Sequence, residues 1–138
     1  MTLSDQSLLE ATWEHSRDGL LLLKWVEERQ DLQVVLINPV AQQMTSGRLI
    51  PGAFLCEELP VHRELNPFIG ERLIDYYKGI LDSGLASKRT FPVDDETVGG
   101  WWENDSVAIG DRHLFVAFRY VGFCMKKEMT GLADRKQF

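Results

Sequence analysis

The spacing of hydrophobic and polar residues changes along the chain, and near the N-terminus it is helical. Leu9 and Trp13 lie four residues apart, on one face of a helix, and a Ser-x-x-Glu capping box opens at Ser7. We therefore expect a short amphipathic helix over Ser7–Ser16. Gly19 follows it and suits the left-handed conformation that often ends a helix.

Further along, short segments rich in leucine, valine and isoleucine, some of them alternating with polar residues, favour strands. Turns of polar residues or glycine separate five such segments. They are Gly19–Val26, Leu32–Ile37, Lys88–Val93, Thr97–Ile109 and His113–Val121. The polar segment 27–31 has a length that fits an antiparallel hairpin between the first two strands.

Two Asn-Pro pairs in the middle of the chain predict helix starts, because Asn accepts hydrogen bonds from the first helical amides and Pro suits the first helical position. Asn38-Pro39 opens a short helix over Pro39–Thr45. Asn66-Pro67 opens the longest helix, over Phe68–Ser83, where apolar residues recur at spacings of three and four before Gly84. Strands at both ends of a helical middle indicate an α+β domain.

The composition is that of a single ordinary globular domain. Of 138 residues, 44% are hydrophobic and 26% are charged, which is enough to bury a core. The 21 acidic and 15 basic side chains give a net charge of -6, which repels phosphate backbones and anionic lipid surfaces. We therefore expect no nucleic-acid partner and no membrane contact.

The cysteines and the N-terminus indicate a cytoplasmic protein. Cys56 and Cys124 lie far apart and outside CxxC spacing, as is typical of reduced thiols. The longest aliphatic run, Leu20–Leu23, is too short for a bilayer, which needs about 20 residues. The first residues also lack the charged and apolar regions of a signal peptide.

The order of predicted elements and several short motifs resemble the PAS (sensory box) family. The motifs are Asp18-Gly19, Ile37-Asn38-Pro39-Val40-Ala41, Ile50-Pro51-Gly52, Glu57-Glu58-Leu59-Pro60, Trp101-Trp102-Glu103 and Val116-Ala117-Phe118-Arg119. The resemblance implies a PAS-like, profilin-like, five-stranded antiparallel sheet with helices on one face. It implies a non-catalytic sensory domain over residues 18–121, preceded by an N-terminal helix in residues 1–17, that controls a C-terminal output domain.

The C-terminal segment, residues 129–138, is similar to the opening of a GGDEF domain, where a Leu-Thr-Gly-Leu-x-Asn-Arg segment ends the first helix. This resemblance implies that residues 122–138 are a linker and the start of a GGDEF domain in a parent protein that makes cyclic di-GMP. Alternatively, residues 134–137 are the Asp-x-Thr-Glu-Arg-Lys-like end common to PAS domains. Gly99 and Gly100 precede tryptophans rather than metal-binding carboxylates, which favours a β-bulge or close packing there. This chain is therefore not expected to be an enzyme.

In a PAS-like arrangement the curved sheet and the helices enclose a space. Its predicted lining residues are Leu22, Ile37, Met44, Phe54, Leu73, Tyr77, Trp102, Phe115 and Ala117, with Arg119 at its edge. Tyr77 and Arg119 would supply polar groups within apolar walls. Two interpretations stay open, namely a filled core and a cavity for a small ligand.

We expect no cofactor. The three histidines, His15, His62 and His113, lie on separate elements without ligand spacing, and the longest predicted helix lacks the histidine that ligates iron in haem-binding PAS domains. Cys56 lies outside the Asn-Cys-Arg-Phe signature of flavin-binding light sensors. The run Asp94-Asp95-Glu96 is more typical of a solvated turn than of a metal site.

The N-terminal helix predicts a homodimer. Leu9 and Trp13 form an apolar stripe that one helix cannot bury alone, and PAS-like domains resemble one another in pairing through such helices. The alternative is that the helix folds back on its own sheet. Two other functions also remain open, namely a purely structural dimerisation module and a small α+β ligand-binding enzyme with a cone-shaped pocket.

Overall fold

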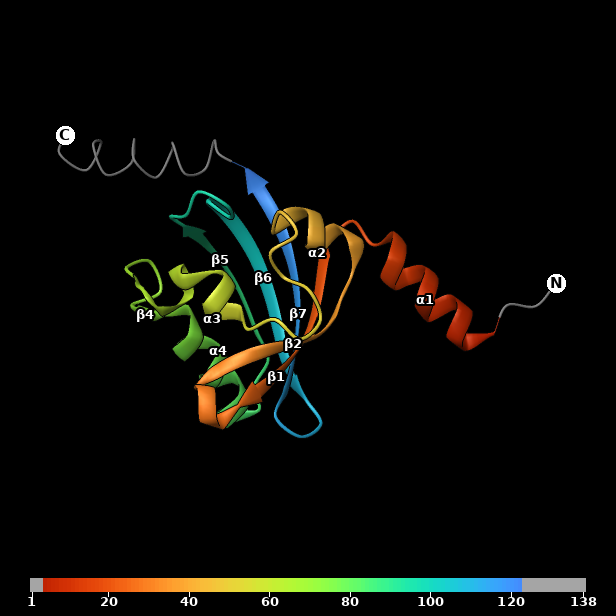
Figure 1. Ribbon diagram of the computed structural model, residues 1–138, viewed down its shortest axis with the longest axis horizontal. Coiled ribbons are helices and arrows are strands. Elements are labelled where there is room, and N and C mark those ends of the chain that lie inside the picture. The colour runs from red at the N-terminus through yellow and green to blue at the C-terminus, as the bar shows by residue number, and fades with distance from the viewer. Residues whose placement is uncertain (1–3, 123–138) are drawn as a thin grey trace.

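The computed structural model describes residues 4–122, and a five-stranded antiparallel sheet forms its centre (Figure 1). The strands are β1 (Gly19–Val26), β2 (Asp31–Ile37), β5 (Ser87–Val93), β6 (Gly100–Ile109) and β7 (His113–Gly122). Their order in the sheet is β2-β1-β7-β6-β5, with every neighbouring pair antiparallel. The predicted α+β, PAS-like sheet is confirmed.

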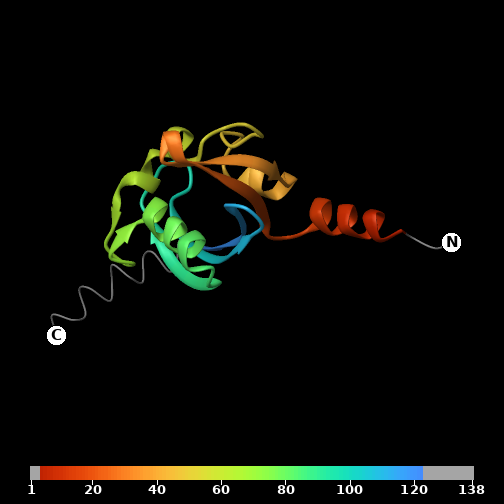
Figure 2. The same cartoon turned by 90° about the horizontal axis from the view of Figure 1, so that it is seen from below.

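Short helices cover one face of this sheet, and one helix projects away from the domain (Figures 1 and 2). The elements besides the sheet are α1 (Asp5–His15), η1 (Glu27–Arg29), α2 (Pro39–Met44), α3 (Leu55–Glu58), η2 (Pro60–Arg63), the small hairpin of β3 (Leu65–Asn66) and β4 (Glu71–Arg72), and α4 (Leu73–Ser83). Helix α1 is the projecting one, and none of its residues is buried.

The start of α1 differs from the prediction. Ser4, not Ser7, is the N-cap, and its Oγ accepts a hydrogen bond from the Ser7 amide at 3.1 Å. Gly19 lies inside β1 and does not take the left-handed conformation expected of it. A Cβ at Gly19 would stand 2.5 Å from the Phe118 ring, so close approach of that ring is the reason for glycine here.

Asn38 joins three elements and is fully buried. Its Oδ1 accepts from the amide of Ala41 at 2.9 Å, which caps α2 as predicted, and from the amide of Leu20 in β1 at 2.9 Å. Its Nδ2 donates to the carbonyls of Trp13 in α1 and Asp18, at 3.1 and 3.0 Å. The Asn38 side chain thus accepts two hydrogen bonds and donates two, and these bonds hold α1, β1 and α2 together.

The second Asn-Pro pair does not start a helix, and the prediction of a helix from Phe68 is wrong at its N-terminal end. Asn66 Oδ1 accepts from the amide of Phe68 at 3.0 Å, and its Nδ2 donates to the carbonyl of Pro92 at 2.8 Å. The first bond lies within the turn of the β3–β4 hairpin, which passes through Gly70 at φ +80°, and the second joins the hairpin to β5. Helix α4 begins only at Leu73.

The start of β6 also differs from the prediction, because residues 96–98 form a turn and β6 begins only at Gly100. Asp95 Oδ1 accepts from the amides of Thr97 and Val98 at 2.7 and 2.9 Å. Gly100 follows at φ +128°, and a Cβ there would lie 2.5 Å from the Tyr120 ring. The pairing of β6 with β7 shifts register between Trp101 and Trp102, so the expected bulge with close packing at the paired glycines is confirmed.

A buried carboxylate anchors the helical layer to the sheet. Asp31 begins β2 and is 3% exposed. Its Oδ1 accepts from the amides of Leu32 and Cys56 at 2.7 and 3.0 Å, and Arg63 lies 3.8 Å from its Oδ2. Cys56, the second residue of α3, is buried. Burial raises the pKa of its thiol, so the thiol stays protonated.

Candidate functional site

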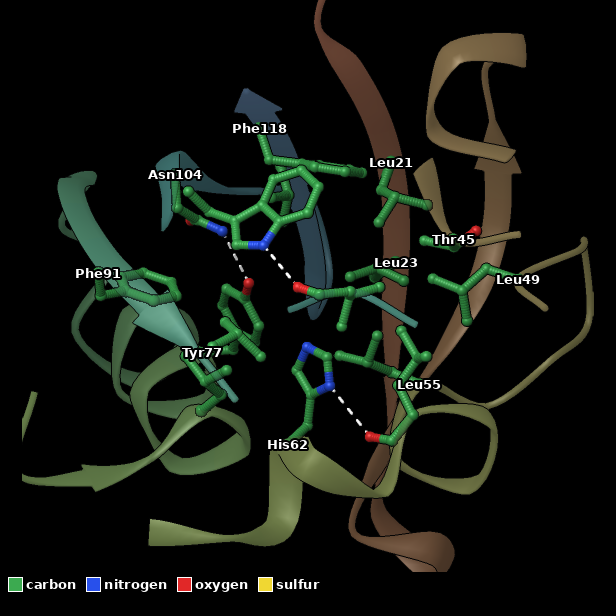
Figure 3. A pocket seen from close by; sticks show the side chains of 16 residues that line it. Leu21, Leu23, Thr45, Leu49, Leu55, His62, Tyr77, Phe91, Asn104 and Phe118 are labelled. Carbon is green, nitrogen blue, oxygen red and sulfur yellow. Dashed lines mark hydrogen bonds between the residues drawn. The ribbon is translucent and has the colours of Figure 1, made fainter. Parts of the chain in front are cut away.

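A cavity of about 60 Å³ lies between the sheet and the helical layer (Figure 3). Four polar residues line it, namely Thr45, His62, Tyr77 and Asn104. The apolar lining residues are Leu21, Leu23, Leu49, Leu55, Leu59, Leu73, Phe91, Val93, Val98, Trp102, Val116 and Phe118. One water needs roughly 10–15 Å³ of such space, and a benzene-binding cavity about 150 Å³. The cavity therefore suits a few heavy atoms.

Three of the predicted lining residues reach this cavity. Leu73 and Tyr77 extend from α4, and Trp102 extends from β6. Trp102 is held firmly, because its Nε1 donates to the Val98 carbonyl at 2.7 Å and its ring packs edge-on against Phe118 with centroids 5.6 Å apart. Whether the cavity binds a ligand stays a prediction.

Leu22, Phe115 and Ala117 do not line the cavity, contrary to expectation. Side chains alternate along a strand, and the residues of β1 and β7 that line the cavity are the neighbours of these three, such as Leu21 and Val116. The predicted residues therefore lie on the opposite face of the sheet, where the Phe115 ring contacts that of Trp13, 6.4 Å between centroids.

Arg119 is not a polar group of the cavity either. It is exposed, one residue after Phe118 in β7, and its Nε lies 3.0 Å from Oδ1 of Asp18. The carboxylate of Asp18 raises the pKa of this guanidinium further. The arginine therefore belongs to an ion pair at the edge of the outer face.

The last three predicted lining residues lie beside the core rather than in the cavity wall. Ile37 and Met44 are partly buried and pack against the core cluster. Phe54 is half-buried at the start of α3, and the guanidinium of Arg29 lies over its ring at 4.0 Å from the centroid. Its ring therefore meets a surface cation instead of the enclosed space.

Three polar side chains form a buried chain that ends at the cavity. Ser106 Oγ donates to Asn104 Oδ1 at 2.5 Å, and Asn104 Nδ2 donates to the Tyr77 hydroxyl at 2.8 Å. All three residues are buried. Burial raises the pKa of Tyr77, so its hydroxyl stays protonated at neutral pH.

His62, which is not among the predicted lining residues, is 8% exposed and lines the cavity. Its Nδ1 lies 3.0 Å from the Leu59 carbonyl oxygen, and its ring stacks on Tyr77 with centroids 6.4 Å apart. Burial lowers the pKa of His62, against the smaller opposing effects of this hydrogen bond and of Asp31 and Asp95. The imidazole is therefore neutral at pH 7.

A larger groove of about 480 Å³ lies beside the β3–β4 hairpin, and Val61 and Asp94 are among its lining residues. Its buried amide, Asn66, already donates to Pro92 and accepts from Phe68. The groove thus lacks the converging polar groups with spare hydrogen-bonding capacity that mark a specific small-molecule site. The cavity at His62 and Tyr77 is the better candidate.

Between residues 4 and 122, no three His, Cys, Asp or Glu side chains gather closely enough to hold a metal ion. Asp95, in the acidic run, uses one carboxylate oxygen to bind two amides of its own turn. Within the same range, no helix combines the length and the apolar character needed to span a bilayer.

No family model matches the chain, and no curated protein matches it either. Solved structures do. A LOV protein from Rhodobacter sphaeroides superposes with a TM-score of 0.54 at 19% identity, covering 86% of this chain and 69% of that one. A domain of an HTR-like protein from Haloarcula marismortui gives 0.53 at 14% identity, with 78% and 100% covered.

A third similar structure is a domain of the sensory box sensor histidine kinase/response regulator from Geobacter sulfurreducens. Its TM-score is 0.52 at 14% identity, with 83% of this chain and 92% of that one covered. The shared feature is the antiparallel sheet with helices on one face. This chain therefore has the PAS fold.

Proposed function

We propose that this chain is a non-catalytic sensory domain in which a small ligand in the core cavity regulates an output domain at the C-terminal end. The observation that carries the proposal is a cavity between the sheet and the helical layer with two buried polar groups, His62 and Tyr77, at its wall. The similar solved structures include a sensory box histidine kinase/response regulator, which supports a regulatory role.

Strand β7 is the proposed route from cavity to output. Val116 and Phe118 line the cavity, and the strand continues from them to Gly122, where the described residues end. A ligand that interacts differently with two positions of β7 shifts their ratio tenfold for each 1.4 kcal/mol or so of difference. We further propose that the output is a GGDEF domain, from the resemblance of residues 129–138, which lie outside the described residues.

Native mass spectrometry of the purified chain tests the sensory role. The expected result is a co-purifying small molecule, or stabilisation by one from a metabolite screen, that Tyr77→Phe weakens. For the output, the parent protein is expected to make cyclic di-GMP from GTP, whereas this chain alone is not. If neither native mass spectrometry nor the metabolite screen finds a ligand, the structural dimerisation module is favoured instead. The small cavity volume also supports that alternative.

An enzyme with a cone-shaped pocket would need a His–carboxylate pair at its cavity. The lining residues contain no Asp or Glu, and the Nδ1 partner of His62 is a backbone carbonyl. We therefore do not propose catalysis for this chain. The buried, protonated thiol of Cys56 supports a cytoplasmic location, which we also propose.

We propose that the chain pairs with a second copy through α1 and the outer face of the sheet. Helix α1 has 11 residues, none of them buried, and Leu9 is 71% exposed. Isolated helices shorter than about 12–15 residues are marginal in water, so a partner surface would stabilise α1. The outer face carries an apolar row of cross-strand neighbours over four strands, in the order Leu36, Leu22, Phe115 and Val107. Trp13 of α1 contacts this row at Phe115.

A further inference from the structure

Hydrogen bonds to neighbouring groups indicate where two polar side chains of the cavity wall, His62 and Tyr77, carry their protons. A carbonyl oxygen only accepts hydrogen bonds. The Nδ1 of His62 lies 3.0 Å from the Leu59 carbonyl oxygen, so Nδ1 carries the proton. Because the imidazole is neutral, Nε2 is then an acceptor. Figure 3 shows that this second nitrogen points into the cavity, and no group among residues 4–122 donates to it.

Tyr77 presents the opposite capacity. In the structure, Asn104 Oδ1 accepts from the Ser106 hydroxyl and its Nδ2 donates to the Tyr77 oxygen. A phenol hydroxyl that accepts one bond keeps its own proton to donate. No described group accepts this proton, and the hydroxyl lies at the cavity wall (Figure 3).

The other polar atoms of the wall each have at least one hydrogen-bond partner. Trp102 Nε1 donates to Val98, and Thr45 Oγ1 donates to the Ala41 carbonyl at 2.9 Å. Two groups of the wall lack such a partner among the described residues, namely the acceptor His62 Nε2 and the proton of the Tyr77 hydroxyl, and both lie within leucine-rich walls. Buried polar groups that stay unpaired are costly, so both call for a ligand or water.

We propose that this cavity binds a small uncharged molecule that donates one hydrogen bond to His62 Nε2 and accepts one from the Tyr77 hydroxyl, as a short aliphatic primary amide does. This inference rests on the proposed sensory function and names its ligand class. The volume of about 60 Å³ limits the ligand to roughly two to four heavy atoms, by comparison with the about 150 Å³ that hold benzene. No charged side chain lines the cavity, and the nearby Asp31 and Asp95 disfavour an anion.

Three molecules with the same four-atom planar skeleton test the class, namely acetamide, acetone and acetate. Acetamide donates and accepts, acetone only accepts, and acetate is charged. Each is titrated into the ¹⁵N-labelled chain, and the ring nitrogens of His62 are followed by NMR. So few atoms bind weakly, so the titrations extend into the millimolar range. Acetamide is expected to bind about tenfold tighter than acetone, the effect of one buried hydrogen bond, and acetate is expected not to bind.

Two variants assign the bonds. His62→Asn keeps a donor at the Nδ1 position for the Leu59 carbonyl but removes the Nε2 acceptor, so acetamide affinity should fall to that of acetone while acetone is unaffected. Tyr77→Phe removes the donor and should weaken both. If either variant fails to fold, the wild-type spectrum remains decisive, because the free protein must show the Nδ1–H tautomer and acetamide must shift the Nε2 signal.

Several results would overturn the proposal: an Nε2–H tautomer, acetone binding as tightly as acetamide, acetate binding the tightest, or a cavity that takes only water. The two levels of failure are distinguishable. If the three probes do not bind but a larger or charged molecule co-purifies with the chain, the ligand class is wrong and the sensory function stands. If nothing co-purifies and the parent protein does not respond to any small molecule, the sensory function itself fails.

Discussion

The two faces of the central sheet use similar side chains in different ways. On the inner face, Leu21, Leu23 and Val116 are buried against helices, and the polar side chains His62, Tyr77 and Asn104 line the cavity. On the outer face, Leu22 and Phe115 stay half-buried, and only α1 lies beside them. Within residues 4–122, helices pack on the inner face, whereas the outer face has only α1 beside it. We therefore propose ligand binding at the inner face and pairing at the outer face.

Adjacent leucines on β1 give the largest expected contrast. Leu23 is 1% exposed and Leu22 is half-buried on the other face. Leu23→Ala should reduce the free energy of unfolding by about 3–5 kcal/mol, because it leaves a cavity in the core, and Leu22→Ala by less than about 1.5 kcal/mol. Urea denaturation of both variants measures this. Equal losses would contradict the assignment of the two faces.

The second effect is a pH dependence that comes from His62. Because its pKa is lowered in the folded state, the unfolded chain, with the ordinary value of 6.5, takes up the proton first as the pH falls. Stability is therefore full above about pH 6.5 and decreases below it, with a slope of at most about 1.4 kcal/mol per pH unit. His62→Asn should remove this slope between pH 5 and 7.

Glu27 and Asp75, two carboxylates with lowered pKa values, do not interfere in this window. Hydrogen bonds from Trp25 and Arg72 lower the pKa values of Glu27 and Asp75, whose ordinary values are 4.5 and 3.8, so the stability that these groups contribute is lost only in more acidic solution. Denaturant titrations at several pH values distinguish the cases. A slope that persists in His62→Asn would assign it to another group.

Pairing through the outer face is expected to be the next most sensitive property. Trp13→Glu should weaken self-association by at least tenfold, about 1.4 kcal/mol, and change the stability of the monomer little, because no residue of α1 is buried. Sedimentation measures the association. Leu85→Glu is a matched control, since Leu85 is 72% exposed in the loop after α4. If the control weakens pairing as much, or if the wild type is monomeric at tens of micromolar, the proposed surface is wrong.

The smallest effect is expected at Arg119. Its ion pair with Asp18 is exposed, and such pairs contribute about 0–1 kcal/mol. Arg119→Ala should therefore lower the free energy of unfolding by less than about 1 kcal/mol, as measured by thermal denaturation. Added salt should make this loss smaller, because it screens exposed ion pairs. The substitution should also leave acetamide binding unchanged. If Arg119→Ala weakens acetamide binding, Arg119 contributes to the cavity after all.

The sequence contained enough local information for the strands and the first Asn-Pro helix start. The same dipeptide misled at Asn66, because Asn66 lies in a hairpin and its side chain binds the carbonyl of Pro92 in β5, 26 residues away. Asn38 instead caps the helix that follows it. The outcome depends on tertiary contacts that no local pattern contains.

The cavity was harder to predict for two physical reasons. Four successive leucines in β1 hide the period-two alternation, so the residues facing inward could be placed one position out, as happened with Leu22. His62 lies in a short 3-10 turn that resembles a surface segment. It is buried by α4 and the sheet, elements distant in sequence, so no signal near His62 announces its position.

The buried amide of Asn38 gives the molecule the geometry of a lever. One side of the amide binds the amides of Leu20 and Ala41, and the other binds the carbonyl of Trp13, near the end of α1. Helix α1 has 11 residues and extends about 16 Å. A tilt of about 10° at its contact with Asn38 would therefore move the N-terminal end of α1 by about 3 Å. Helix α2 leads directly to Thr45 at the cavity wall. A sub-ångström shift there would therefore be amplified along α1.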